Sequence, residues 1–215
     1  MVRTRPQIPA DQRAQWRETY ERTPYRKLPW FSARPFPWVR EAANSGWFPR
    51  GARVLDVGCG AGTNAIYLAK SGLRMSGIDL APGAIRAAQG RATRLGLDID
   101  FRVGDALRLP YSKRFFGGLV DVGCFHTLPL ELRSSYAREL ARVLRPAGHY
   151  VLAWVAREYG ATFGPPHRPS LEEVAATFEE EFLFRRTEFH PASRNPLPAY
   201  YALLERRSRS RPRAR

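Results

Sequence analysis

The chain of 215 residues is 44% hydrophobic and 12% aromatic and carries a formal net charge of +15, a composition typical of one globular domain rather than of a disordered chain. It has no apolar run approaching the roughly 18 residues that span a membrane, no signal-peptide core at its N-terminus, and two cysteines, Cys59 and Cys124, that lack disulfide-framework spacing. We therefore expect a cytoplasmic protein without a membrane partner.

The positive charge is almost entirely arginine, because only three of the 35 Lys and Arg residues are lysine. The arginines are spread along the chain, which is more typical of a coding-composition bias than of a nucleic-acid-binding surface. Residues 206–215 are the exception, since arginines dominate there without an apolar anchor. This segment is predicted to be a disordered, solvated tail. A polyanion-binding tail, and with it a nucleic-acid partner, is the alternative that stays open.

The first 49 residues are expected to form a helical extension that precedes the main domain, residues 50–205. Pro37 occupies the first turn of a predicted helix, a position that tolerates proline. Ahead of that helix the extension is rich in aromatic residues. We expect it to cover a ligand site as a lid made by Trp16, Tyr20, Trp30 and Phe31.

From residue 50 onward, short apolar runs alternate with helical patterns. Strands are predicted at 53–57, 73–78, 98–103, 119–125 and 149–155, and helices at 63–70, 82–95 and after Pro129 as far as Leu144. Residues 145–148 are predicted to be a turn, 157–170 a loop, 171–178 a short helix, and 182–189 and 199–204 an antiparallel edge hairpin. Strand–helix alternation predicts an α/β fold with a parallel sheet between helices.

Ligands of such folds bind beyond the carboxyl ends of the strands. Four segments of this chain lie at or just past predicted strand ends, namely residues 58–62, Asp79, Asp105 and residues 121–126. The sequence therefore predicts that these segments converge on one site.

The pattern Asp56-x-Gly58-x-Gly60-x-Gly62 leads from a strand into a helix, where a turn without side chains lets a ligand approach the backbone. Its second half also satisfies the dinucleotide fingerprint, with Asp79 near the position of the ribose-binding acid. A nicotinamide-dependent oxidoreductase is therefore an alternative. Asp56 argues against it, because a carboxylate repels a pyrophosphate and attracts an amino group.

The chain resembles the class I S-adenosylmethionine-dependent methyltransferases over about residues 50–155. The resemblance rests on four motifs in the family's order, at residues 54–62, 77–80, 104–106 and 143–148. It implies S-adenosyl-L-methionine as the cofactor. It also implies a Rossmann-like three-layer α/β/α sandwich around a mostly parallel seven-stranded sheet with an antiparallel last strand.

The same resemblance implies roles at the methionine end of the cofactor. Gly58, Cys59, Gly60 and Gly62 would form the turn beneath it, and Asp56 would face its amino group.

At the adenosine end, Asp79 would accept hydrogen bonds from both ribose hydroxyls. Leu80 would pack on the adenine, and Asp105 would accept from its exocyclic amine beside Ala106. Asp121 lies in the C-terminal part of the predicted fourth strand and is predicted to belong to the same site.

The segment 121–129 lacks the Asn/Asp-Pro-Pro-aromatic motif of methyltransferases that act on nucleobase amines. It is similar instead to small-molecule methyltransferases. His126 is a candidate general base, because imidazole titrates near neutral pH. The alternative, which we favour, is a histidine that fixes the loop through a backbone hydrogen bond.

Residues 30–37 are similar to a segment that covers the cofactor in the thiopurine, thiol and halide methyltransferase-like group. Trp30 would then lie beside the sulfonium through a cation–π interaction, and Arg34 would reach the methionine carboxylate. An N-terminal extension that merely packs against the sheet is the alternative.

We thus predict a methyltransferase that transfers a methyl group to a sulfur, nitrogen, oxygen or halide atom of a small molecule by in-line displacement, without a metal. A loop with Tyr159 and Phe163 would help to enclose this acceptor. An RNA- or protein-directed methyltransferase is the second alternative, and the oligomeric state stays open.

Overall fold

The computed structural model describes residues 6–156, 168–191 and 198–208. Its helices, including the two short 3-10 helices η1 and η2, are α1 (Ala10–Arg22), η1 (Tyr25–Lys27), α2 (Pro37–Asn44), α3 (Thr63–Lys70), α4 (Pro82–Thr93), η2 (Phe125–Thr127), α5 (Leu130–Val143) and α6 (Leu171–Phe178). The strands are β1 (Arg53–Val57), β2 (Arg74–Asp79), β3 (Asp100–Val103), β4 (Phe116–Val122), β5 (Leu144–Val155), β6 (Phe182–His190) and β7 (Ala199–Arg206).

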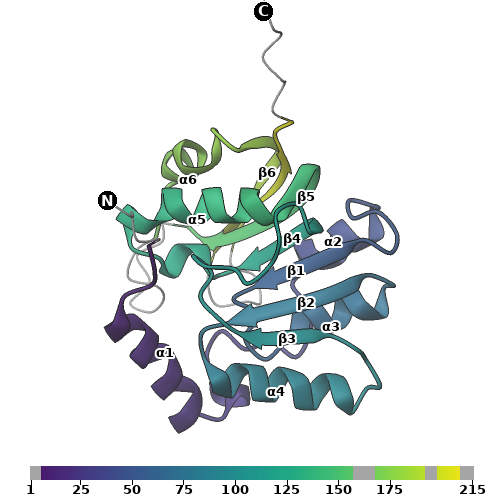
Figure 1. Ribbon diagram of the computed structural model, residues 1–215, viewed down its shortest axis with the longest axis vertical. Coiled ribbons are helices and arrows are strands. Elements are labelled where there is room, and N and C mark those ends of the chain that lie inside the picture. The colour runs from purple at the N-terminus through teal and green to yellow at the C-terminus, as the bar shows by residue number, and fades with distance from the viewer. Residues whose placement is uncertain (1–5, 157–167, 192–197, 209–215) are drawn as a thin grey trace, which may run out of the picture.

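The seven strands form one sheet in the order β3-β2-β1-β4-β5-β7-β6 (Figure 1). The pairs from β3 through β5 are parallel, whereas β7 runs antiparallel to both β5 and β6. Strand order reverses between β1 and β4, and this reversal opens a crevice at their carboxyl ends. The predicted fold class is therefore confirmed, including the antiparallel last strand.

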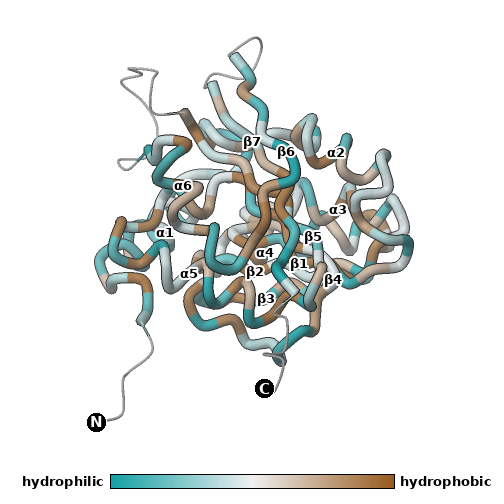
Figure 2. Tube along the Cα trace, turned by 90° about the horizontal axis from the view of Figure 1, so that it is seen from above, coloured by the Kyte–Doolittle hydropathy of each residue, from teal (hydrophilic) through white to brown (hydrophobic). Residues whose placement is uncertain are grey.

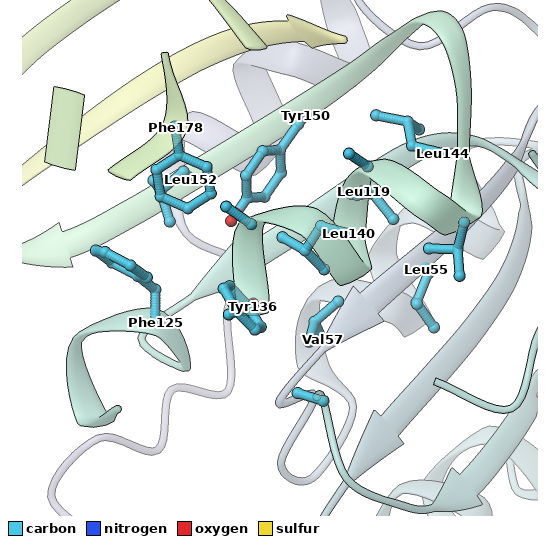
Figure 3. Close-up of a cluster of buried hydrophobic side chains, with 14 of the residues drawn as sticks. Leu55, Val57, Leu119, Phe125, Tyr136, Leu140, Leu144, Tyr150, Leu152 and Phe178 are labelled. Atoms are coloured by element: carbon cyan, nitrogen blue, oxygen red, sulfur yellow. The ribbon is translucent and has the colours of Figure 1, made fainter. Parts of the chain in front are cut away.

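One face of the sheet is covered by α5 and α6. In Figure 3, Tyr136 and Leu140 of α5 lie against Leu55, Leu119 and Tyr150 of the sheet. All five side chains are fully buried. Each such large side chain contributes about 1.5–3 kcal/mol when it leaves water, so this face holds much of the stabilising core.

The opposite face is covered by α2, α3 and α4, which pack on alternate residues of the same strands. Val54 and Val120, for example, belong to this second core, whereas their neighbours Leu55 and Leu119 belong to the first. This alternation is the period-two geometry of a strand buried on both faces. In Figure 2 hydrophobic residues are concentrated along the central strands, and hydrophilic residues lie toward the periphery.

The fourth strand differs from its predicted bounds of 119–125, because β4 begins at Phe116 and ends at Val122. The side chain of Asp121 causes this ending: it accepts hydrogen bonds from the backbone N–H groups of Cys124 and Phe125. A carboxylate that bonds the backbone a few residues ahead turns the chain out of the ladder.

The predicted turn at residues 145–148 is also different, because β5 already begins at Leu144. Leu144 pairs with Phe116, and the next pair is Gly118 with His149, so the intervening residues bulge out of the ladder. Ala147 has a φ of 55° there, which marks the kink.

Other boundaries shift by one to three residues. β3 begins at Asp100 instead of residue 98, and α4 ends at Thr93 instead of residue 95. The predicted tail starts too early at 206, because Arg206 pairs with Phe182 within the sheet and Arg207 donates its N–H to the carbonyl of Glu181. None of the helices in the described ranges is long and apolar enough to cross a membrane.

Candidate functional site

A cavity of about 650 Å³ lies where the carboxyl ends of β1, β2 and β4 meet, beneath the N-terminal segment. Figure 1 shows α1 standing apart from the sheet on this side and reaching α4. The cavity is lined from α1, from the segment 29–38, from the turn after β1 and from the ends of β2, β4, β5 and β7. It is therefore the site at which the predicted strand ends converge.

The glycine turn forms the floor of the cavity. Gly58 and Gly60 have φ angles of 68° and 52°, a region that L side chains rarely adopt. A Cβ on Gly58 would lie 2.6 Å from the Cβ of Cys124, and one on Gly60 would lie 3.0 Å from the Tyr20 hydroxyl. The N–H groups of Gly58 and Cys59 both donate to the carbonyl of Ile78, which ties the turn to β2.

Gly62 has a different role from the one predicted for it, because it does not line the cavity. A Cβ there would lie 2.8 Å from the ring of Phe101 and 2.9 Å from Ala88. Its φ of 76° starts α3 in the left-handed region. This glycine therefore allows α3 to approach its neighbours and makes no direct contact with the cavity.

Asp56 lies at the inner wall of the cavity and is 2% exposed. Its Oδ2 accepts a hydrogen bond from the N–H of Ala65 in the first turn of α3. Burial raises the pKa of this carboxyl to about 8, against the lowering effect of Ala65, and the neighbouring Asp121 and Asp79 raise it further. A cationic ligand would lower this pKa again by stabilising the carboxylate.

Asp79 ends β2 and faces the cavity beside the glycine turn. Its Oδ2 accepts from the N–H of Gly60 and its Oδ1 from the N–H of Ala81, both at 2.9 Å. Burial raises the pKa of this carboxyl, while the two backbone hydrogen bonds act in the opposite direction. Each oxygen keeps a lone pair, so the carboxylate can accept from two adjacent hydroxyl groups.

Leu80 and Ala106 line the cavity as predicted, but Asp105 does not. The Asp105 carboxylate accepts from the N–H of Ile8 at 2.9 Å and from that of Leu107 at 2.8 Å. It therefore fastens the N-terminal segment to the domain, and Ile8 occupies the adjacent cavity wall. The predicted hydrogen bond to an adenine amine is not supported by this geometry.

Asp121 is likewise absent from the cavity wall and is fully buried. Besides its two bonds to the backbone, it accepts a hydrogen bond of 2.6 Å from the Tyr136 hydroxyl of α5. Burial raises its pKa to about 6, although these hydrogen bonds act to lower it. Asp121 thus shapes the turn after β4 rather than contacting a ligand.

The four aromatic residues that were expected to form a lid all line the cavity, and the Trp30 indole N–H donates to the Tyr20 hydroxyl at 3.2 Å. Trp16 meets Trp30 edge-on, with ring centroids 5.5 Å apart. The predicted cavity loop with Tyr159 and Phe163 lies outside the described residues.

Arg34 is exposed and does not line the cavity, so its predicted contact with a carboxylate is not supported. Arg91 of α4 lies near the glycine turn instead. Its Nη1 donates to the Ala61 carbonyl and to the Thr63 hydroxyl, and its guanidinium lies 5.5 Å from the ring centroid of Phe31. Arg91 therefore joins the turn to the N-terminal extension from outside the cavity.

His126 lies on the wall formed by η2 and the end of β5. Its Nδ1 accepts a hydrogen bond of 3.1 Å from the N–H of Val155, as the favoured interpretation of the sequence had it. Burial lowers the pKa of this histidine to about 3, and the cationic Arg133 and Arg168 lower it further. It is therefore neutral at physiological pH.

Several cavity residues escaped the sequence analysis. Ile8 and Gln12 stand in a polar segment without a motif, and Ala199 belongs to a strand far along the chain. Trp38 gave one usable signal, because an aromatic residue directly after Pro37 lies at the start of a predicted helix. In the parts of the chain that the structure describes, no group of three or more His, Cys, Asp or Glu side chains forms a metal site.

The charges on the cavity wall are unexpectedly few. Within residues 6–156, 168–191 and 198–208, Asp56 and Asp79 are the only acidic side chains that line it, and no Lys or Arg does so. In a chain with 35 Lys and Arg residues, this makes the cavity acidic within a basic protein. Such a wall favours a cationic ligand over a polyphosphate.

Comparison with known proteins gives a family match and relatives over much of the chain. Residues 54–148 match the model described as "Methyltransferase domain". A 2-heptyl-1-hydroxyquinolin-4(1H)-one methyltransferase of Mycobacteroides abscessus is 32% identical over 155 residues, which cover 70% of this chain and 67% of the relative. For other curated relatives the aligned part is only between 34% and 52% of their length.

Two solved structures share nearly the whole fold. One was solved in connection with the conversion of a disulfide bond into a thioacetal group during echinomycin biosynthesis; its TM-score is 0.80 at 23% identity, over 93% of this chain and 94% of that one. The other is the Burkholderia thailandensis 1,6-didemethyltoxoflavin-N1-methyltransferase with bound S-adenosylhomocysteine, with a TM-score of 0.71 at 20% identity, over 93% and 88% of the two chains. At these identities the likeness concerns the fold.

Proposed function

The chain belongs to the class I S-adenosylmethionine-dependent methyltransferases, and from that premise we propose that it methylates a small, flat, largely apolar heteroaromatic compound at an oxygen, nitrogen or sulfur atom. The observation that carries this proposal is the composition of the cavity wall. Two carboxylates face the glycine turn, and the wall toward the end of β5 is built from apolar and aromatic side chains. The first feature suits a cationic cofactor, and the second suits an apolar acceptor.

The residues around the glycine turn fit S-adenosylmethionine. The turn at Gly58 and Gly60 is a cradle that any Cβ would fill. Asp56 lines the cavity and would face the amino group of the cofactor, and Asp79 keeps lone pairs that would accept from the ribose hydroxyls. The Oε1 of Gln12 is buried without a hydrogen-bond partner in the described structure and offers a further acceptor for the cofactor. When bound, the cofactor supplies an activated methyl group on a cationic sulfur.

The acceptor side of the cavity is lined by Phe36, Trp38, Val122, Trp154 and Val155. Aromatic side chains of this kind bury flat rings well and exclude water. Close alignment of an acceptor lone pair with the methyl group, at about 3–3.5 Å, supplies much of the acceleration that such a reaction needs. The relative from Mycobacteroides abscessus and the Burkholderia enzyme are both named for heteroaromatic acceptors, which supports the proposal.

A closer relation to the thiopurine, thiol and halide methyltransferase-like group is a narrower form of this proposal. Trp30 supports it, because it lies at the cavity as that group's segment would place it. Arg34 does not support it, since it is exposed to solvent. Thiol compounds and halide ions are therefore tested as a separate set of acceptors in the experiment below.

The test is an acceptor panel. The full chain is incubated with S-adenosylmethionine and one compound at a time, and S-adenosylhomocysteine is measured by mass spectrometry. We expect turnover with hydroxy- or amino-substituted heteroaromatic compounds, and none with a structured RNA or a basic peptide. The Asp79→Asn variant is the negative control, because it keeps the acceptor wall intact. Turnover confined to RNA, peptide or halide ions would overturn the proposed acceptor class.

A further inference from the structure

The imidazole of His126 takes the place of a missing strand partner. β4 ends at Val122, and the last backbone bond between the two strands there runs from the N–H of Gly123 to the carbonyl of Ala153. Two residues further along β5, the N–H of Val155 donates to His126 Nδ1 at 3.1 Å. The ring therefore satisfies a backbone donor that β4 no longer reaches.

This hydrogen bond fixes the protonation of the ring. A neutral imidazole carries one proton, and the nitrogen that accepts a hydrogen bond is the one without it. Since Nδ1 accepts from Val155, the proton is on Nε2. His126 lines the cavity, and with Nδ1 bonded to Val155 the nitrogen left for a ligand is Nε2. The neighbouring residue is Gly123, and the Cβ that it lacks would lie 3.5 Å from Nε2.

The charged groups around His126 keep it neutral. Arg133 of α5 and Arg168, which precedes α6, both disfavour a second proton, and burial does so more strongly. The neighbouring Cys124 offers no thiolate, because burial raises its pKa. This side of the cavity thus presents a fixed N–H donor, and within residues 6–156, 168–191 and 198–208 it presents no basic lone pair.

We propose that His126 is a specificity-determining residue that donates a hydrogen bond from Nε2 to an oxygen or nitrogen of the acceptor and removes no proton from it. This inference rests on the proposed function. It selects acceptors that carry a hydrogen-bond acceptor atom on the methylated ring and that are nucleophilic without a base from the enzyme. Enolates, hydroxamate-like N-oxides and neutral ring nitrogens meet both conditions.

The bond changes balance without a catalytic base. The lone pair of the acceptor atom forms the bond to the methyl carbon, while the methyl–sulfur bond breaks and leaves its electron pair on sulfur. An anionic acceptor becomes a neutral product, and its proton has already gone to water. A neutral pyridine-like ring nitrogen, which carries no proton, becomes a cationic N-methyl product. Where that charge acidifies another N–H or O–H of the ring, the proton goes to water after the transfer.

Two substitutions separate the roles of the two nitrogens. In His126→Asn the amide oxygen can replace Nδ1 as the acceptor for Val155, but no donor remains at the position of Nε2. In His126→Gln the amide nitrogen reaches the position of Nε2, but the acceptor for Val155 is lost. His149→Asn is the matched control, because His149 lies at the other end of the regular pairing of β5, against Trp47.

We expect His126→Asn to keep the cofactor affinity and to lower kcat/KM for a heteroaromatic acceptor by about 10- to 100-fold, the effect of losing one hydrogen bond to a charged oxygen. His126→Gln should recover part of this loss, and His149→Asn should change kcat/KM less than about twofold. When kcat/KM is measured against pH for two acceptors of different pKa, the fall on the acid side should occur at the pKa of each acceptor. If the fall in kcat/KM occurs at the same pH for both acceptors and is absent in His126→Asn, His126 is a general base and the proposal is overturned.

A readout without turnover separates this inference from the proposed function. The ¹⁵N shifts of the His126 ring in the protein without ligands should show a protonated Nε2 and a bare Nδ1 from pH 5 to pH 9. A protonated Nδ1, or titration near the ordinary histidine pKa, would overturn the assignment whatever the acceptor panel shows. If the shifts agree but no heteroaromatic compound is methylated, the proposed function fails and the donor role with it.

Discussion

Asp79 is the residue whose loss should weaken cofactor binding most clearly. Its two oxygens hold the Gly60 and Ala81 N–H groups and keep lone pairs for the ribose. Asp79→Asn puts an N–H₂ group where an acceptor is needed and removes the negative charge. Hydrogen bonds to a charged group contribute about 1.5–3 kcal/mol each, so we expect the Kd for S-adenosylmethionine to rise about 10- to 100-fold.

Isothermal titration of the purified variant measures this change. Asp98→Asn is the matched control, because it makes the same substitution at an exposed residue far from the glycine turn. An unchanged Kd in Asp79→Asn would show that the ribose is held elsewhere.

Asp56 should make the stability of the ligand-free protein depend on pH. Burial raises its pKa in the folded protein to about 8, above the ordinary value of 3.8 that applies in the unfolded chain. The folded state therefore binds the extra proton between these two values, and stability falls as pH rises through this window. Asp56→Asn removes the titration, so the variant should lose less stability than the wild type between pH 5 and pH 8.

Urea unfolding of both proteins at the two pH values tests this sign. Asp98→Asn again serves as the control and should follow the wild type. A wild type that gains stability from pH 5 to pH 8 relative to Asp56→Asn would contradict the burial of an uncompensated carboxyl.

The sequence could predict some of these acids and not others, for a physical reason. Asp56 and Asp79 are positioned by the strand–turn–helix segment in which they stand, so a local motif contains their role. Asp105 and Asp121 instead accept hydrogen bonds from residues distant in the sequence. The donors are the N–H of Ile8 for Asp105 and the hydroxyl of Tyr136 for Asp121. A pattern of spacing carries no information about such partners.

At the scale of elements, the docking of α1 on α4 should control the lid. The backbone and Cβ of Tyr20 lie against Gly83, where an added Cβ would be 2.9 Å from the Tyr20 carbonyl oxygen. Gly83→Ala therefore forces the two helices apart, at an overpacking cost of about 1–3 kcal/mol. We expect weaker binding of S-adenosylmethionine and faster tryptic cleavage within α1, although Gly83 does not line the cavity.

Gly90→Ala is the matched control for that substitution, since Gly90 lies in the same helix and an added Cβ there would make only an ordinary contact of 3.8 Å with Arg94 Nη1. It should stabilise α4 by about 0.5–1 kcal/mol, because alanine loses less conformational entropy in a helix than glycine. Equal protease sensitivity of the Gly83→Ala and Gly90→Ala variants would mean that α1 does not depend on this contact.

Elements whose hydrophobic residues follow a clear pattern were predictable from the sequence. The bounds of β1 and α3, for example, match the predicted ones. The ends of β4 and β5 were not, because each is decided by a tertiary event. The side chain of Asp121 turns the chain out of β4, and a bulge lets β5 begin before the predicted turn has ended. The place of Ile8 in the cavity wall likewise depends on a long-range hydrogen bond.

At the scale of the whole molecule, charge is divided between a basic exterior and an acidic cavity. The formal net charge is +15, whereas the described cavity wall holds two acidic side chains, Asp56 and Asp79, and no Lys or Arg. A polyanion is attracted to the former and repelled from the latter. Binding of nucleic acid should therefore be independent of binding of the cofactor.

This division leads to a test of the nucleic-acid alternative. A fluorescent single-stranded RNA should bind at 50 mM salt and lose most of its affinity by 200 mM, because such binding is driven by counterion release. Saturating RNA should leave the Kd for S-adenosylmethionine unchanged within about twofold, and radioactive methyl groups should not enter the RNA. Competition between RNA and cofactor, or methylated RNA, would mean that the basic exterior leads a polyanion into the cavity, which the acidic wall is expected to prevent.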